Sequence, residues 1–449
     1  MRTKSGSGIG PAVRFKRRLA RAFLEFDRLE TSGGLVLLGC ALVALVWANS
    51  IWSDSYFEIA STTIALQIGS FLIDKPLILW INDGLMALFF FVVGLEIKRE
   101  LVAGELSSVK KAALPAAAAI GGVVVPAAIY LAFNAGTPSE RGWGIPMATD
   151  IAFSLGVLAL LGKRAPYELK VFLTALAIVD DLIALLVIAL FYTHDINLTA
   201  LGYAAGLMGV LTMLNLAQVR NLVPYVLLGL VLWVLILKSG VHATIAGVLV
   251  AFAVPVRNVV DSRKFVEDSL HAIETFKASE TGTYNDLPSE GQVDAIHDLS
   301  RLAYSVQSPL IRAELMIHPW TTYFVVPVFG LMNAGIELHG SVHQALLERT
   351  TLGVILGLVI GKPVGIFLAS WLGVKLKLVQ MPRNFTYGIV LGAGALAGIG
   401  FTMSLFISEL AFKDPVLLYD AKLGILTASA VSAILGLLLL KRFLRKAGT

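Results

Sequence analysis

Long apolar runs, separated by short polar stretches, recur along almost the whole chain. Several reach the roughly 20 residues that an α-helix needs to cross the hydrocarbon core of a bilayer. Twelve runs have recognisable ends: 34–50, 78–97, 112–133, 143–160, 170–192, 198–217, 222–237, 240–256, 319–337, 351–373, 386–411 and 421–440. This pattern predicts an all-α polytopic membrane protein with about twelve transmembrane helices.

The segments between and around these runs divide the chain. Residues 1–33 form a basic tail, 34–256 hold the first eight spans, 318–440 hold the last four, and 441–449 form a second tail. Residues 257–317 carry ten acidic and six basic side chains, so we expect a long loop outside the membrane that is partly helical over 262–278.

Two short segments have patterns of their own. Residues 62–74 alternate in polarity around Gly69-Ser70, which predicts a small β-hairpin. In residues 11–29, apolar side chains fall at helical spacing among six basic ones, as in an amphipathic helix on a membrane surface. A solvated tail without regular structure is the alternative. The apolar positions are Phe15, Leu19, Phe23 and Phe26.

The basic residues predict how the chain is oriented. If the N-terminus is cytoplasmic, 29 of the 36 Lys and Arg residues lie on the cytoplasmic side and six on the other, with Lys362 inside a span. Cytoplasmic loops of membrane proteins carry an excess of Lys and Arg. We therefore expect both termini and the loop 257–317 in the cytoplasm and the hairpin 62–74 on the opposite side.

Composition supports the same class. Hydrophobic residues make up 57% of the chain and charged residues only 15%, compared with about 25% charged in soluble proteins. The chain therefore lacks the charge to solvate a surface of this size. Its single cysteine, Cys40, lies in the first apolar run, where it cannot form an internal disulfide and is expected to pack.

Charged residues inside the apolar runs are few, and four lie well away from the ends: Asp150, Asp180, Asp181 and Lys362. Each costs about 2.5–3.5 kcal/mol at the centre of a bilayer on insertion scales. A buried salt bridge that only locks helices together is one interpretation, but one lysine cannot neutralise two adjacent aspartates.

Adjacent buried carboxylates have a chemical use. They cannot both ionise cheaply in a medium of low dielectric constant, so they hold protons or a cation. Hard cations such as Na⁺ prefer oxygen ligands. Protons and Na⁺ then compete for the same oxygens, and that competition is itself an exchange mechanism.

The fourth and eleventh runs contain residues that interrupt helices. Pro146 breaks the fourth run, and the eleventh carries Gly392, Gly394, Gly398 and Gly400. Runs three to five and ten to twelve would form matching halves, since Ile151-Ala-Phe-Ser154 is similar to Ile399-Gly-Phe-Thr402. Interrupted segments at matching positions mark the binding site in transporters with inverted repeats. We therefore predict that the fourth and eleventh runs are interrupted helices that hold the binding site of a transporter with inverted repeats.

Nine motifs, in order and over nearly the whole chain, resemble those of the bacterial NhaA sodium/proton antiporters. They are Asn82-Asp83-Gly-Leu-Met-Ala, Gly94-Leu-Glu96-Ile-Lys98-Arg-Glu100, Ala148-Thr149-Asp150-Ile-Ala-Phe, Val179-Asp180-Asp181, Val241-His242-Ala-Thr, His318-Pro-Trp, Asn333-Ala-Gly, Gly361-Lys362-Pro363 and Gly398-Ile-Gly-Phe-Thr-Met-Ser404. Together they are highly specific, whereas any one alone would not be.

The resemblance implies a fold of twelve spans with inverted repeats, in which helices four and eleven are interrupted and cross at mid-membrane. It also implies roles for the residues in these motifs. Asp181 matches the principal cation-binding carboxylate, and Asp180 matches the neighbour that alternates between a proton and a salt bridge with Lys362. Asp150 and Lys362 match charges that offset the half-helix dipoles. Thr149 matches a hydroxyl beside the cation path.

The resemblance also implies regulation and assembly. Four residues match the family's cytoplasmic pH-responsive region: Glu96, Glu100, His242 and Glu314. The hairpin 62–74 resembles the family's homodimer contact, whereas the loop 257–317 is far longer than the family's linker.

The activity implied is that of a secondary transporter, not an enzyme, in the bacterial inner membrane. It exchanges cytoplasmic Na⁺ or Li⁺ for external H⁺, electrogenically and under pH control. We expect no cofactor and no nucleic-acid partner. An intramembrane aspartyl protease would need carboxylates on facing helices, and a cation channel would need a continuous pore, usually between symmetric subunits.

Overall fold

The computed structural model describes residues 32–68, 71–193, 196–256, 262–279, 288–338, 342–382 and 385–447 of the 449-residue chain. The amphipathic helix predicted for residues 11–29 lies outside these ranges.

Helices dominate the described part of the chain. Seven are long and apolar enough to cross a membrane: Leu77–Ala103, Val109–Asn134, Tyr167–Phe191, Leu198–Leu216, Pro309–Asn333, Arg349–Lys375 and Pro415–Arg445. Three more candidates are helix pairs bent at a short break: Ser32–Ala48 with Ser53–Ser61 (112°), Pro138–Met147 with Ile151–Ala159 (45°), and Tyr387–Ala397 with Phe401–Ala411 (51°). Two shorter apolar helices are Val223–Lys238 and Thr244–Ala253. Each of the twelve predicted runs corresponds to one of these helices or helix pairs, which confirms the all-α polytopic fold. By length and composition, seven helices could span a membrane, or ten if each bent pair is one span.

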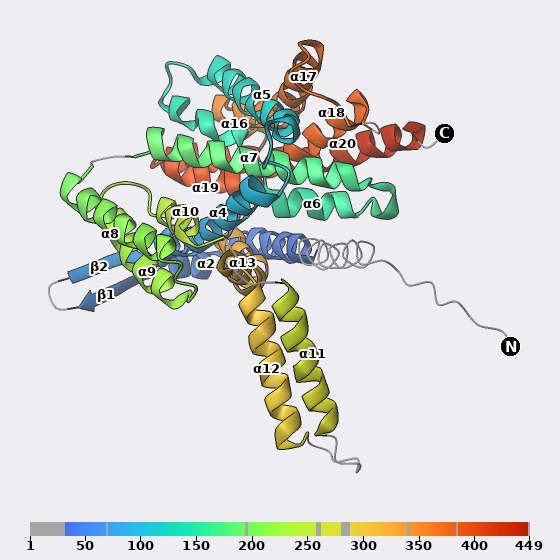
Figure 1. The fold of residues 1–449 in the computed structure, drawn as a ribbon. Coiled ribbons are helices and arrows are strands. Elements are labelled where there is room, and N and C mark those ends of the chain that lie inside the picture. Colours follow the sequence, from blue (N-terminus) through green and yellow to red (C-terminus); the bar gives the residue numbers. More distant parts are fainter. Residues whose placement is uncertain are drawn as a thin grey trace.

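The labels used below follow Figure 1. In the first half they are α2 (Ser53–Ser61), β1 (Thr63–Ile68), β2 (Phe71–Pro76), α3 (Leu77–Trp80), η1 (Ile81–Leu85), α4 (Met86–Ala103), α5 (Val109–Asn134), η2 (Pro138–Met147), α6 (Ile151–Ala159), η3 (Gly162–Arg164), α7 (Tyr167–Phe191), α8 (Leu198–Leu216), α9 (Val223–Lys238) and α10 (Thr244–Ala253). In the second half they are α11 (Ser262–Ala278), α12 (Glu290–Val306), α13 (Pro309–Trp320), η4 (Thr321–Val325), α14 (Val326–Asn333), α15 (Val342–Ala345), α16 (Arg349–Leu356), η5 (Gly357–Gly361), α17 (Lys362–Lys375), α18 (Tyr387–Ala397), α19 (Phe401–Ala411) and α20 (Pro415–Ala447).

The predicted β-hairpin is present. β1 and β2 pair antiparallel, with the register running from Thr63 opposite Pro76 to Ile68 opposite Phe71. The indole Nε1 of Trp80 donates to the Ile64 carbonyl at 3.0 Å, which ties the hairpin to the start of the following helix. The hairpin lies at the same end of the molecule as α8 and α9 (Figure 1).

Helices α5 and α17 pack at backbone distance where Gly121 meets Gly365. A Cβ on either glycine would collide with the carbonyl oxygen of the other. Small residues at such positions let membrane helices approach closely. The contact holds α17, which begins with Lys362, against α5 in the first half of the chain.

Within the described ranges, three helices contain a π-helical turn: η1 within the second span, η4 after α13, and η5 between α16 and α17. Such turns within α-helices occur frequently at functional sites. The turn η5 directly precedes Lys362.

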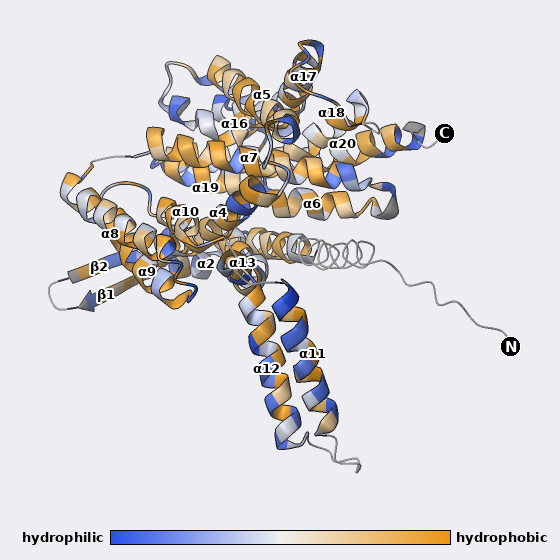
Figure 2. Ribbon diagram, viewed as in Figure 1, coloured by the Kyte–Doolittle hydropathy of each residue, from blue (hydrophilic) through white to orange (hydrophobic). Residues whose placement is uncertain are grey.

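The long loop 257–317 contains more structure than we predicted. The predicted helix at 262–278 is present as α11, but a second helix, α12, runs back beside it, and the two form a hairpin that projects from the helical body (Figure 1). The hydroxyl of Ser289 donates to the Ser279 carbonyl at 2.9 Å and closes the distal end of this hairpin. Figure 2 shows hydrophilic residues concentrated on α11 and α12, in contrast to the largely hydrophobic helices of the body.

The predicted boundary between loop and span at 317–318 is wrong, because it falls inside α13. This helix begins at Pro309, and its N-cap Ser308 accepts from the Ile311 amide at 3.3 Å. Charged Arg312 and Glu314 suggested a solvated loop, but both side chains are buried. Arg312 lies over the Tyr304 ring, 3.9 Å from its centroid, and donates to the Arg220 carbonyl, so its charge has partners inside the protein although its Nε has none among the described residues.

Candidate functional site

The two interrupted helices lie side by side at their breaks. Residues 148–150 separate η2 from α6, and residues 398–400 separate α18 from α19. The Asp150 amide donates to the Ile399 carbonyl at 2.7 Å, so the two breaks are joined through their backbones. Thr149 and Asp150 are both buried.

Two serines make matching contacts across this crossing. Ser154 in α6 donates to the Leu396 carbonyl at the end of α18 (2.9 Å), and Ser404 in α19 donates to the Ile145 carbonyl near the end of η2 (2.8 Å). Carbonyls in the last turn of a helix lack intrahelical partners. Each broken helix therefore satisfies a terminal carbonyl of the other. The likeness of 151–154 to 399–402 pointed to this relationship, but the role of Ser404 was missed.

Asp150 lies at the N-terminal ends of two half-helices. Its Oδ1 accepts from the Phe153 amide at 2.9 Å, which caps α6. Its Oδ2 accepts from the amide (3.1 Å) and the hydroxyl (2.5 Å) of Thr402, in the first turn of α19. A negative charge is stabilised at a helix N-terminus, and here one carboxylate serves two. Thr402 was not among the predicted site residues.

Lys362 lies at the C-terminal end of η2. Its Nζ donates to the carbonyl of Met147, the last residue of η2, and forms an ion pair with Asp180 Oδ2 at 2.7 Å. The Thr149 hydroxyl lies 2.8 Å from the same Asp180 oxygen and 2.9 Å from the Ala397 carbonyl oxygen. Because that hydroxyl has one proton, it can donate fully to only one of them.

Asp181 contrasts with its neighbour. Its side chain is 1% exposed, yet neither carboxylate oxygen has a hydrogen-bond partner among the described residues. Oδ1 of Asp180 is likewise without one. A buried carboxylate in this state is costly unless it holds a proton or a cation. Three carboxylate oxygens beside one lysine are thus available to a ligand.

A second cluster of charges joins α4 to α13. Nε2 of His318 lies 3.8 Å from Glu96 Oε1, and Arg99 forms ion pairs with Glu314 and, at 3.4 Å, with Glu100. The structure thus brings together three of the four residues predicted for pH response. Arg99 and His318, although within the recognised motifs, were not assigned to the site.

The fourth residue, His242, lies elsewhere. It precedes α10, and its ring packs edge-on against Phe406 with centroids 5.8 Å apart. At the other end of α10, the Lys98 ammonium donates to the Phe252 and Val254 carbonyls, close to the Glu96 cluster. Ten residues of helix, about 15 Å, therefore separate His242 from that cluster. The resemblance grouped it with the cytoplasmic acidic residues, whereas it lies near the β-hairpin, where Lys238 donates to the Leu72 carbonyl at 3.3 Å.

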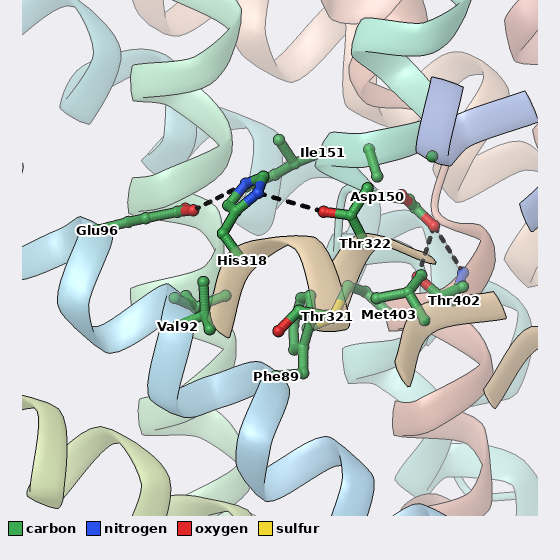
Figure 3. Close-up of a pocket in the computed structure, with 14 residues that line it drawn as sticks. Phe89, Val92, Glu96, Asp150, Ile151, His318, Thr321, Thr322, Thr402 and Met403 are labelled. Atoms are coloured by element: carbon green, nitrogen blue, oxygen red, sulfur yellow. Dashed lines mark hydrogen bonds and ion pairs between the residues drawn. The ribbon is translucent and has the colours of Figure 1, made fainter. Parts of the chain in front are cut away.

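A cavity of about 60 Å³ lies between the two clusters. Figure 3 shows Glu96 and His318 on one side of it and Asp150 with Thr402 on the other. The His318 ring also contacts the Thr322 hydroxyl, with 3.4 Å between Nδ1 and Oγ1. A cavity of this volume has room for a few water molecules, and its polar lining groups could bind them. Apolar residues such as Phe89, Val92 and Met403 make up most of its lining, and its polar groups include Glu96 and Asp150.

Interrupted helices that cross, with carboxylates and a lysine buried at their breaks, define a secondary transporter rather than an enzyme. The chain belongs to the Na⁺/H⁺ antiporter 1 family, whose model matches residues 24–440.

Curated relatives agree with this assignment over more than nine tenths of their length. The chain is 49% identical over 430 residues to the Na(+)/H(+) antiporter NhaA of Oleidesulfovibrio alaskensis, covering 95% of each chain. It is 46% identical to the NhaA of Koribacter versatilis, covering 94% of this chain and 92% of the relative. It is 47% identical to the NhaA of Helicobacter pylori, covering 94% of this chain and 95% of the relative.

Proposed function

We propose that this antiporter exchanges Na⁺ or Li⁺ for H⁺ at Asp180 and Asp181, with access alternating between the two sides of the membrane. The observation that carries the proposal is the buried Asp181 carboxylate, which has no partner among the described residues and lies next to the Asp180–Lys362 ion pair. Oxygen ligands of this kind suit a hard cation. When the cation leaves, protons take its place, because a bare carboxylate pair in this environment is unstable.

Lys362 and Asp180 would act as the second proton-carrying element. Asp180 Oδ2 is engaged by Lys362 and Thr149, whereas Oδ1 is free of hydrogen bonds in the described structure. A cation that recruits Asp180 oxygens weakens the attraction that holds the proton on Lys362. Sodium binding then displaces protons from more than one group, so more positive charge enters as H⁺ than leaves as Na⁺. Exchange is therefore electrogenic.

The charges at the ends of the broken helices would keep the site in place while it opens to either side. Asp150 faces the N-terminal ends of α6 and α19, and Lys362 faces the C-terminal end of η2. Each charge has the sign that the adjacent helix end favours. This arrangement stabilises irregular backbone that would otherwise leave polar groups unsatisfied in the membrane.

Regulation and assembly complete the proposal. Glu96, Glu100 and Glu314, linked by Arg99, would adjust exchange to cytoplasmic pH, with His242 contributing separately from the far end of α10. The protein would lie in the bacterial inner membrane with both termini cytoplasmic. The hairpin β1–β2 would form a homodimer contact through its exposed strands.

The test uses purified protein in liposomes with an imposed proton gradient and a pH-sensitive dye. Asp181→Asn should abolish the dye response to Na⁺ and Li⁺. Asp420→Asn, which changes a buried carboxylate in α20 away from the crossing, is the matched control and should retain it. Normal exchange by Asp181→Asn would refute the assignment, and a voltage-driven sodium current without proton counterflow would indicate a channel.

A further inference from the structure

Helix α20 lies along the second broken helix. It packs against both α18 and α19, and it approaches α18 at backbone distance at two glycines. A Cβ on Gly436 would lie 3.0 Å from the Leu396 amide nitrogen, and one on Gly392 would lie 3.4 Å from the Leu440 amide nitrogen. Small residues allow such close approach between membrane helices. The break at residues 398–400 is therefore backed by α20.

Ser429 of α20 binds the backbone at this break. Its Oγ accepts a hydrogen bond from the Phe401 amide at 3.1 Å, and its side chain is buried. Phe401 is the first residue of α19, whose N-cap, Gly400, has no side chain to supply a cap. The first four amides of a helix lack intrahelical partners. Ser429 therefore caps α19 from another helix.

The next amide of α19 is capped by a residue of the first half of the chain. Asp150 Oδ2 accepts from the Thr402 amide, whereas Ser429 Oγ accepts from the Phe401 amide. Two consecutive amides at the start of α19 are thus fixed by two different helices. An unpaired buried amide costs free energy comparable to a lost hydrogen bond. Without the Ser429 hydroxyl, the first turn of α19 would be free to shift against Asp150.

A constant spacing relates the two halves of the chain. The likeness of residues 151–154 to 399–402 corresponds to a spacing of 248 residues. The same spacing separates Pro115 in α5 from Pro363 in α17. Helix α7 is the next long helix after η2–α6, as α20 is after α18–α19. Helices α7 and α20 therefore have equivalent places in the two halves.

This spacing makes Ser429 the counterpart of Asp181. At the counterpart of Asp180 the second half has Ala428, so only one of these two positions keeps a polar side chain. In α7 the aspartate pair supplies the carboxylates of the candidate site. In α20 the remaining polar group binds the backbone of the break instead.

Ser432, one turn further along α20, provides a contrast. Its side chain is also buried, but its hydroxyl has no hydrogen-bond partner among the described residues. The two serines share a helix, a size and a degree of burial, and they differ in whether the hydroxyl binds the break. Ser432→Ala is therefore the matched control for Ser429→Ala.

We propose that Ser429 is a positioning residue for exchange, whose hydroxyl holds the first turn of α19 so that Thr402 stays on Asp150 while the site opens to either side. The inference rests on the proposed exchange at Asp180 and Asp181. Ser429 makes no hydrogen bond to either aspartate in the described structure, and its partner is the Phe401 amide. It therefore acts on the movement of the broken helices and not on the affinity for the cation.

Exchange kinetics of the full chain in liposomes test the proposal. Ser429→Ala should lower the maximal rate of Na⁺/H⁺ exchange roughly threefold to tenfold, the effect of one lost hydrogen bond, and leave the apparent KM for Na⁺ unchanged. Ser429→Thr, which restores a hydroxyl, should recover the rate, and Ser432→Ala should match the unmodified protein in both quantities.

Three kinetic results would overturn the proposal. The first is unchanged kinetics in Ser429→Ala. The second is an equal loss of rate in Ser432→Ala, which would show that packing of α20 matters and the hydroxyl does not. The third is a raised KM at full maximal rate, which would make Ser429 part of the cation site.

Hydrogen–deuterium exchange locates the effect on α19. In nanodiscs, peptides that contain the Phe401 amide should exchange roughly threefold to tenfold faster in Ser429→Ala than in the unmodified protein or in Ser432→Ala. Peptides from α5 should not differ among the three proteins. Unchanged exchange at Phe401 would overturn the proposal even if transport falls.

Comparison with Asp181→Asn separates this inference from the proposed function. If Asp181→Asn abolishes exchange while Ser429→Ala changes nothing, the role of Ser429 is wrong and the site stands. If Asp181→Asn exchanges normally, the proposed site is wrong whatever Ser429→Ala does.

Discussion

Lys362 and Asp180 form an ion pair in which the ammonium nitrogen lies 2.7 Å from Asp180 Oδ2, and neither side chain is exposed at all. The same ammonium donates to the last carbonyl of η2, so one lysine satisfies a carboxylate and a helix end together. Neighbouring Asp181 receives no hydrogen bond from the described residues. This asymmetry between adjacent aspartates is the structural basis of the proposed exchange.

Lys362→Ala should lower thermal stability as well as transport. Removing one partner of a buried ion pair costs about 3–5 kcal/mol, because the remaining charge is left uncompensated. We expect the melting temperature in detergent, followed by intrinsic fluorescence, to fall by several degrees. Lys375→Ala, at the other end of α17, is the control and should melt near the unmodified protein. An unchanged melting curve for Lys362→Ala would remove the ion pair from the account.

Asp150 and Thr402 should be energetically coupled. Thr402→Val removes a hydroxyl that lies 2.5 Å from Asp150 Oδ2 but keeps the shape of the side chain. Side-chain hydrogen bonds between membrane helices contribute on average about 0.6 kcal/mol, with a maximum of about 1.7. A double-mutant cycle with Asp150→Asn, measured by unfolding in mixed micelles, should give a coupling energy in this range. Strictly additive effects would show that the carboxylate does not join α6 to α19 in the way described.

Much of this site could be predicted from the sequence, because a charge inside an apolar run stands out. Asp150, Asp180, Asp181 and Lys362 were found in this way, and Pro146 indicated one of the breaks. Other partners carry no such signal: hydroxyls such as Thr402 and Ser404 are common in membrane helices, and the carbonyl that Lys362 binds belongs to the backbone.

Errors arose where local polarity conflicted with tertiary contacts. Arg312 and Glu314 suggested solvent, yet both are buried in α13 through ion pairing and stacking. Helix α12 is amphipathic and packs mainly on α11, so hydropathy alone did not distinguish it from a polar loop. The resemblance placed His242 in the cytoplasmic region, whereas it lies just before the N-terminal end of α10, near the β-hairpin.

Transport should respond to membrane potential. If each Na⁺ displaces protons from more than one group, net charge crosses the membrane in every cycle, and each elementary charge is driven by about 2.3 kcal/mol per 100 mV. With equal pH on both sides and the potential set by potassium and valinomycin, an imposed potential should move Na⁺ in the direction opposite to the net charge. Sodium flux indifferent to the potential would mean electroneutral exchange, and Lys362 with Asp180 would then be structural partners only.

Proton release on cation binding tests the central claim most directly. Na⁺ is added to purified protein in weakly buffered detergent solution, and protons released per Na⁺ bound are measured with a pH indicator together with radioactive Na⁺ binding. The account predicts more than one proton per Na⁺ for the unmodified protein, and neither binding nor release for Asp181→Asn, while Asp420→Asn behaves as the unmodified protein. Undiminished Na⁺ binding and proton release by Asp181→Asn would contradict exchange at the aspartate pair.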